Sequence, residues 1–405
     1  MLTRALAGVR VIEWCQGIAG PYCSRLLAEF GATVIKIEAP GTGDAARWRG
    51  PFLRGATGPV GDPESSALFF TYNVSKMSVT LRPELPAGAD VLRELVSRAD
   101  VFLEDREPGV LAELGCGEQA LRGGHPELVI LSLSPFGQTG PYRGYKAHGA
   151  CAFHAGGEGY LQPGGPARTD KGDRPPAGPG GDVAETMTGM TAACGAIAAL
   201  LRRGRTGRGD HLDVSKQEAL MTLSRTDLSV YPNQGVIERR DTRLLPIGGL
   251  FQTLDGFIEI NPTERRMWEG LVEAMGRPAW SQAPSMQEQT PPFSHAAEVR
   301  QHVEEWTRHR HGDEIERLLQ EHKCVSGAIL SLGQVANKEQ FHHRQLFAAI
   351  HEPRFGTVRL ATSPFGGDKP TYRPAPHLGE HTDQVLAELG LNPGDIESLR
   401  EKGVV

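Results

Sequence analysis

Apolar and polar residues alternate along the first third of the chain in blocks that predict strands and helices in turn. Val9–Trp14 (VRVIEW) and Thr33–Ala39 (TVIKIEA) are apolar runs typical of buried strands, and the segment between them, Gly20–Ala32, has a helical pattern that ends at Gly31. The same order returns in SVTL after Lys76, ADVLRELVSRA, VFLE and ELVILSLS. Strands that alternate with helices predict an α/β fold with a mainly parallel sheet covered on both faces.

The pattern changes in the middle of the chain. Between Gly137 and Gly181 glycines are frequent and periodicity is weak, which predicts a long irregular loop. A helix-forming run from Val183 to Gly204 and a short strand, HLDVS, follow. Beyond about Asp227 come turn-rich strands and amphipathic helices. We predict a large Rossmann-like domain in residues 1–226, a smaller α+β domain in residues 227–335, and a C-terminal segment, 336–405, that returns to the large domain.

Composition excludes several classes of function. The chain has 43 Lys and Arg against 49 Asp and Glu, with no dense basic run, so no nucleic-acid partner is expected. The six cysteines are scattered without a CxxC pair, which favours reduced thiols and no metal site. The N-terminal segment has no apolar signal region and no 18-residue apolar run is evident, so we expect a cytoplasmic protein without a membrane partner.

One short stretch combines glycines with two acids. In GPGGDVAETMTGM (Gly178–Met190), Asp182 and Glu185 stand three residues apart at the predicted start of a helix. An Asp at the N-cap and a Glu three residues later form a variant of the capping box. This arrangement stabilises the start of a helix and does not imply a catalytic role. The alternative is that one of the two carboxylates carries the chemistry, and the stretch alone leaves both interpretations open.

Several common enzyme motifs do not occur. The glycine-rich pieces GTGDAARWRG and GGEGYLQPGG match neither the GxGxxG dinucleotide fingerprint nor a P-loop. HExxH, GxSxG and DxDxG are also absent from the sequence. Nucleotide hydrolysis, hydride transfer and serine or zinc hydrolysis therefore have no support in the sequence.

Several short segments, distributed along the chain, together resemble one known family over almost the whole chain. They are LAGVRVIEW, GPYCSRLLAEFGATVIKIEAPGTGD, YNVSKMSVTLR, FLEDREPGVLAELG, LSLSPFGQTGPYRGYKAHG, RRGRTGRGDHLDVS and APHLGEHTDQVLAELG. In these segments the chain resembles the family III CoA transferases, which include formyl-CoA and carnitine CoA transferases and related acyl-CoA racemases. The resemblance implies an interlocked homodimer that moves CoA between an acyl-CoA and a carboxylic acid, with coenzyme A as substrate and no metal.

The resemblance also implies a carboxylate nucleophile that opens the helix before the TGRG turn. In members of the family that this chain resembles, the Asp usually stands ten residues before a glycine. In this chain the residue ten positions before Gly195 is Glu185. Asp182 is the alternative, because G-D is the commoner family dipeptide, but its use requires a three-residue insertion inside a helix, nearly a full turn. We favour Glu185 as the nucleophile, which attacks the thioester and passes through anhydride and enzyme-CoA thioester intermediates.

Candidate CoA-binding residues follow from the same resemblance. CoA carries phosphates and an adenine, so its site needs cations and backbone N–H groups in a crevice at the carboxyl ends of parallel strands. The candidates are Ile18, Ala19, Asn73, Lys76, Arg106 and Lys146.

His148 supports a second enzyme activity. It stands at the position where the racemases of the family have a segment similar to G-H-D. A His and an acid that face one another across the α-carbon of a substrate can carry protons in both directions. Gly149, however, replaces the Asp of that pattern. A 2-methylacyl-CoA racemase that uses His148 and an acid, and a non-catalytic protein that binds CoA thioesters, therefore remain as alternatives.

Overall fold

The computed structural model describes residues 2–53, 62–162, 175–222, 225–237, 247–288 and 290–405. By their internal contacts these residues divide into two units. Unit 1 contains Met1–Gly156, Pro179–Leu223 and Glu339–Val405, and unit 2 contains Gly157–Gly178 and Ser224–Lys338. Unit 1 is therefore built from three separate stretches of the chain.

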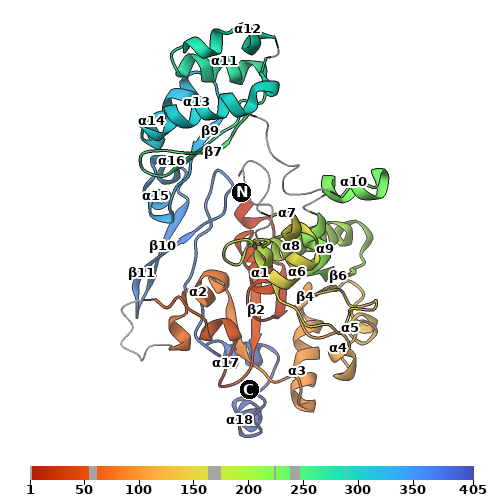
Figure 1. Ribbon diagram of the computed structural model, residues 1–405. Helices are drawn as coiled ribbons and strands as arrows, with labels where there is room; N and C mark the ends of the chain where they lie inside the picture. The colour runs from red at the N-terminus through yellow and green to blue at the C-terminus, as the bar shows by residue number, and fades with distance from the viewer. Residues whose placement is uncertain (1, 54–61, 163–174, 223–224, 238–246, 289) are drawn as a thin grey trace. The chain divides into compact units, whose positions relative to one another are not determined.

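A six-stranded parallel sheet organises unit 1 (Figure 1), and its strand order is β3-β2-β1-β4-β5-β6. The strands are β1 (Arg10–Trp14), β2 (Thr33–Glu38), β3 (Met77–Thr80), β4 (Val101–Glu104), β5 (Val129–Ser134) and β6 (His211–Ser215). The predicted α/β class and the Rossmann-like sheet are confirmed. The chain runs outward from β1 in one direction and from β4 in the other, so a crevice is expected beyond the carboxyl ends of these two neighbours, where ligands of such sheets bind.

Helices cover both faces of the sheet, and successive residues of each strand point to opposite faces. Val11 and Val101 pack with α1 (Ala19–Glu29) and α8 (Val183–Thr206) on one face. Ile12 and Phe102 pack on the other face with α3 (Pro86–Ser97), α17 (Thr382–Glu388) and α18 (Pro393–Glu401). The near-continuous apolar sequence of these strands follows from this burial on two sides.

Shorter elements complete unit 1. They are α2 (Ala67–Asn73), α4 (Val110–Glu113), α5 (Glu118–Gly124), α6 (Gly149–Ala155), α9 (Lys216–Met221), α16 (Glu339–His343) and the antiparallel pair β10 (Phe347–Glu352) and β11 (Gly356–Ala361). Helix α6 lies inside the segment predicted as an irregular loop, and α7 (Glu158–Leu161) of unit 2 follows it. That prediction was wrong for residues 149–161, while residues 163–174 lie outside the described part of the chain.

Unit 2 has its own core. A three-stranded antiparallel sheet, β7-β8-β9, is formed by Gly249–Gln252, Phe257–Ile260 and Ser326–Ala328. Besides α7, the α-helices of unit 2 are α10 (Arg225–Gln234), α11 (Arg265–Ala274), α12 (Pro284–Gln287), α13 (Ala296–Arg308), α14 (Gly312–Glu321) and α15 (Leu332–Asn337). Phe251, Trp268 and Leu319 are among the buried residues that hold the sheet and helices together.

Candidate active site

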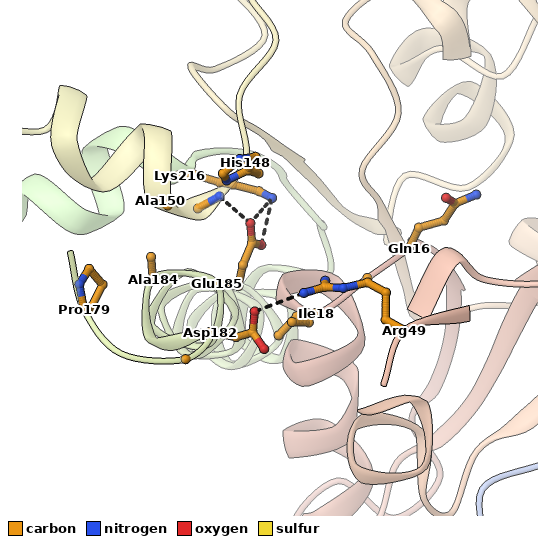
Figure 2. Close-up of a pocket in the computed structure, with 13 residues that line it drawn as sticks. Gln16, Ile18, Arg49, His148, Ala150, Pro179, Asp182, Ala184, Glu185 and Lys216 are labelled. Carbon is orange, nitrogen blue, oxygen red and sulfur yellow. Dashed lines mark hydrogen bonds and ion pairs between the residues drawn. The ribbon is translucent and has the colours of Figure 1, made fainter. Parts of the chain in front are cut away.

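A cavity of about 470 Å³ lies in unit 1, beyond the carboxyl ends of β1 and β6 (Figure 2). Its walls come from the loop after β1, from the starts of α6 and α8, and from the first residue of α9. The lining residues are Gln16, Gly17, Ile18, Arg49, His148, Gly149, Ala150, Pro179, Gly181, Asp182, Ala184, Glu185 and Lys216. The structure thus brings both candidate acids and His148 to one cavity.

Glu185 is the third residue of α8, and its carboxylate is held by two donors from other elements. The Gly149 N–H donates to Oε1 across 2.6 Å, and Lys216 Nζ lies 3.0 Å from Oε1 and 2.8 Å from Oε2. Figure 2 shows these interactions converging on the carboxylate from the side opposite α8. The side chain is 15% exposed, so the carboxylate is fixed in place but open to the cavity.

Asp182 has a different environment. It stands at the N-cap of α8, yet its side chain makes no capping hydrogen bond, and Oδ1 lies 3.5 Å from the Arg49 guanidinium. Glu185 accepts from Gly149 and Lys216 and makes no bond back to the cap. The capping-box interpretation is therefore wrong, because the polar contacts of both acids are tertiary contacts rather than local helix caps.

Glycine at position 189 fixes where α8 begins relative to α1. A Cβ there would lie 2.4 Å from the Ala19 carbonyl oxygen and 3.2 Å from Tyr22 Cβ, so only glycine lets the two helices approach this closely. Glu185 stands four residues before Gly189, on the same side of the helix. This close contact places the Glu185 side chain beside the N-terminal end of α1.

The remaining candidates near β1 and α6 lie at or next to the same cavity. Ile18 is buried and forms an apolar part of the wall, and Ala19, also buried, begins α1 directly behind it. His148 precedes α6 and is exposed, with Nε2 3.8 Å from Cys151 Sγ. The His148 ring therefore lies at the cavity, and among the described residues it has no strong partner that would fix its tautomer.

Asn73 and Lys76 lie in the interior instead. Lys76 Nζ donates to Glu13 Oε2 at 2.8 Å, to Asn73 Oδ1 at 2.8 Å and to the Pro21 carbonyl, and neither Asn73 nor Lys76 lines a described cavity. Burial lowers the pKa of Lys76 to about 8, although the Glu13 carboxylate acts in the opposite direction. A buried carboxylate on a central strand needs compensating cations, and this requirement accounts for the lysine.

The same buried network supports the cavity wall from behind. Lys36 Nζ bridges Glu13 Oε1 and Asp44 Oδ2, each at 2.8 Å. Asp44 Oδ1 in turn accepts the Gly17 N–H across 2.8 Å. Gly17 has a φ of +77°, a conformation that glycine adopts readily, so the loop after β1 is anchored by its backbone.

A second cavity, of about 250 Å³, lies at the carboxyl ends of β4 and β5. Arg106 and Lys146 line it together with Arg143 and Lys216, so the two basic candidates come together here. Arg106 pairs with Asp105 and lies 5.2 Å from the centre of the Trp14 ring, and Lys146, which is largely exposed, pairs with Glu107. Lys216 lines both cavities.

Comparison with known proteins identifies the family. Residues 6–382 match the family described as CoA-transferase family III. The chain belongs to this family. It is 30% identical to the succinyl-CoA–D-citramalate CoA-transferase of Chloroflexus aurantiacus, over 99% of this chain and 98% of that protein. It is 32% identical to the beta subunit of the succinyl-CoA–L-malate CoA-transferase of the same organism, over 100% of this chain and 98% of that protein.

Other relatives and solved structures agree with this assignment. The formyl-CoA:oxalate CoA-transferase of Bradyrhizobium sp. is 28% identical over 100% of this chain and 98% of that protein. The crystal structure of a CAIB/BAIF family protein from Brucella suis superposes with a TM-score of 0.82 at 26% identity, covering 95% of this chain and 99% of that one. The sequence resemblance is thus confirmed, and the protein is a CoA-transferase by family.

Sequence reasoning missed three residues that line the first cavity of this CoA-transferase. Lys216 follows the HLDVS strand, and its position at the carboxyl end of a parallel strand is a signal that could have identified it. Gly149 was noted only as the replacement of an acid, whereas its missing Cβ makes room for Glu185. Arg49 pairs with Asp182 across the cavity, and the sequence shows no pattern that joins these two positions.

Two further observations concern metals and membranes. Within the residues that the structure describes, no group of three or more His, Cys, Asp or Glu side chains is arranged to hold a metal ion. In the same part of the chain, α8 is the one helix long and apolar enough to span a bilayer by length and composition. Its Ala192, Ala196 and Ala199 pack in the core with α1 and the sheet, as expected for a core helix.

Proposed function

We propose that this CoA-transferase moves CoA between an acyl-CoA thioester and a carboxylic acid with the Glu185 carboxylate as nucleophile. The observation that carries the proposal is the placement of that carboxylate: it opens onto a cavity beyond the carboxyl ends of β1 and β6 and is oriented by Gly149 and Lys216. The names of the relatives support CoA transfer as the activity.

The chemistry needs a nucleophile and a place for developing negative charge. Attack of a Glu185 oxygen on the thioester carbonyl forms an anhydride and releases the CoA thiolate. Attack of this thiolate on the Glu185 carbonyl releases the donor acid and leaves CoA on the enzyme as a thioester. The N–H groups in the first turn of α8, which receive no side-chain cap from Asp182, favour the oxyanion formed at each attack, because a helix N-terminus carries partial positive charge.

The phosphates of CoA bind at the second cavity in this proposal. The cations for these phosphates are Arg106, Arg143 and Lys146. When CoA binds, a phosphate oxygen takes the place of Asp105 beside Arg106 or of Glu107 beside Lys146, so each cation keeps an anionic partner. Asn73 and Lys76 have no part in it, because their polar atoms are used in the interior.

The acceptor is a small carboxylic acid. Ile18 gives the first cavity an apolar wall, which favours an acceptor less polar than oxalate. The resemblance to the family further supports an interlocked homodimer in the cytoplasm, with neither membrane nor nucleic acid as partner. Light scattering on the purified chain tests the dimer directly, since it returns either one or two chain masses.

Trapping the intermediate tests the nucleophile. The protein is incubated with acyl-CoA donors, quenched with hydroxylamine or borohydride, digested and analysed by fragment-ion mass spectrometry. We expect the modification on Glu185, its loss in Glu185→Gln, and its persistence in Asp182→Asn. A modification on Asp182 would mean that Asp182, and not Glu185, is the nucleophile. Exchange of CoA without any trapped carboxyl group would mean that the reaction uses neither carboxylate as a nucleophile.

The same samples distinguish the alternatives. A racemase would incorporate solvent deuterium at the α-carbon of a 2-methylacyl-CoA without an adduct, and His148→Gln would abolish that incorporation. A binding protein would leave the thioester intact and unexchanged. Either result would overturn the proposal.

A further inference from the structure

Lys216 combines two features that separate it from an ordinary ion-pair lysine. It is the first residue of α9, and its Nζ lies 2.8 and 3.0 Å from the two oxygens of Glu185. Its side chain is 16% exposed, and that exposed part lines both the cavity at Glu185 and the cavity at Arg106. The ammonium therefore lies beside the reacting carboxylate at a position that both cavities share.

The charge of this pair must change during the proposed reaction. In the free enzyme the Glu185 carboxylate and the Lys216 ammonium balance one another. Once Glu185 is part of an anhydride or a thioester its carboxyl is neutral, and the ammonium loses its counter-ion. Asp182, the other acid that lines the cavity, is paired with Arg49. An ammonium with limited access to water favours a new anion at the same place.

We propose that Lys216 binds the carboxylate of the departing donor acid and then that of the incoming acceptor while Glu185 carries CoA. The proposal rests on Glu185 as the nucleophile. Attack of the thiolate on the Glu185 carbonyl forms the C–S bond and breaks the anhydride C–O bond, so the donor acid leaves as a carboxylate. At that moment the Lys216 ammonium is without its Glu185 partner and pairs with the released carboxylate.

The second half of the cycle runs the same steps in reverse. The acceptor carboxylate replaces the donor acid on Lys216, attacks the Glu185–CoA thioester and displaces the thiolate. The thiolate then attacks the acceptor carbonyl of the new anhydride and restores the Glu185 carboxylate, which pairs with Lys216 again. No oxidant or further reactant is needed. The acceptor class that follows is a carboxylate, since an alcohol or an amine would leave the ammonium without a counter-ion.

The test separates the two half-reactions in Lys216→Met, with Lys216→Arg as the conservative variant. Lys338→Met is the matched control, because Lys338 also pairs with two acids, Asp313 and Glu316, but lies in unit 2. In a single turnover with acyl-CoA alone, we expect Lys216→Met to slow formation of the trapped Glu185 adduct much less than it impairs use of the acceptor, because the Gly149 N–H still orients the Glu185 carboxylate. Its KM for the acceptor should rise by about tenfold or more, as for loss of a hydrogen bond to a charged group. Lys216→Arg should recover most of that loss, and Lys338→Met should change neither quantity.

Two outcomes would overturn the inference. Equal losses in adduct formation and in acceptor use would mean that Lys216 only positions Glu185, and an unchanged acceptor KM would mean that it has no role with the acceptor. If Lys216→Met fails to fold by circular dichroism, Lys216→Gln provides the same comparison. Failure of the proposed function is distinguishable, because the wild-type protein would then form no adduct on Glu185.

Discussion

The Gly149 N–H donates to Oε1 of Glu185 across 2.6 Å, and a Cβ at position 149 would lie 2.9 Å from both Cγ and Oε1 of that side chain. Position 149 therefore supplies a donor and, by lacking a side chain, the room for the acceptor. Gly149→Ala should displace the carboxylate and lower kcat/KM for CoA transfer by about 100-fold, the size expected for a displacement of about 1 Å. Steady-state transfer between an acyl-CoA and a carboxylic acid measures this loss.

Gly204→Ala is the control for that substitution. Gly204 lies in the last turns of α8, is exposed, and a Cβ there would meet nothing within 4 Å. Its replacement should leave transfer unchanged and leave the fold equally or slightly more stable, because alanine favours the helix. Equal activity of Gly149→Ala and Gly204→Ala would contradict the packing of Gly149 against Glu185.

Glu185→Asp tests the length of the nucleophile's side chain. Removal of one methylene withdraws the carboxylate toward α8 and away from the Gly149 N–H and Lys216, which belong to other elements. We expect about a 100-fold loss of kcat/KM with the adduct still detectable, because the nucleophile is retained but misplaced. Full activity of Glu185→Asp would show that the acyl carbon is not matched to the longer side chain.

The sequence predicted the sheet well because its signal is local. Strands β1, β2, β4 and β5 are largely buried on both faces, so runs such as VRVIEW and TVIKIE are mostly apolar, and Gly31 marks the end of the first helix. The start of α6 in the glycine-rich segment was not predicted. A helix of seven residues with Gly at its start has almost no periodicity to detect.

The site was only partly predictable, since its contacts join distant segments. Counting back from Gly195 selected Glu185, whose carboxylate lines the cavity, but the count says nothing about Lys216, 31 residues later. The sequence does not distinguish Lys76 from Arg106, because each appears there only as a single cationic residue. Lys76 neutralises a buried carboxylate and Arg106 lines a cavity, and this difference depends on which strand lies next to each.

Gly189→Ala should affect stability and activity together. Its Cβ would lie 2.4 Å from the Ala19 carbonyl oxygen, a backbone atom, so α8 and α1 must move apart. Overpacking of this kind costs about 1–3 kcal/mol, which urea unfolding can measure. Because Glu185 lies about one turn away, transfer should fall as well, whereas Gly204→Ala on the same helix should change neither. Wild-type stability in Gly189→Ala would contradict the close helix contact.

The pH dependence of stability should report on Glu104, the last residue of β4, which is buried beside the second cavity. Burial raises its pKa from 4.5 to about 7, although hydrogen bonds from Ser132 and the Arg106 N–H act to lower it. The folded chain then keeps a proton that the unfolded chain has already released, so this group's contribution to stability is complete below pH 4.5 and is lost as pH rises toward 7.

Glu104→Gln removes that titration and keeps an oxygen that can accept from the Arg106 N–H, whose distance to Glu104 Oε2 is 2.6 Å. Relative to the variant, the wild-type protein should lose up to about 3 kcal/mol of unfolding free energy between about pH 4.5 and pH 7, since each unit of pKa shift corresponds to about 1.4 kcal/mol. Urea unfolding of both proteins across this range measures the difference, and titrations common to both cancel. A difference that does not change with pH would mean that Glu104 is ionised at its ordinary pKa in the folded protein.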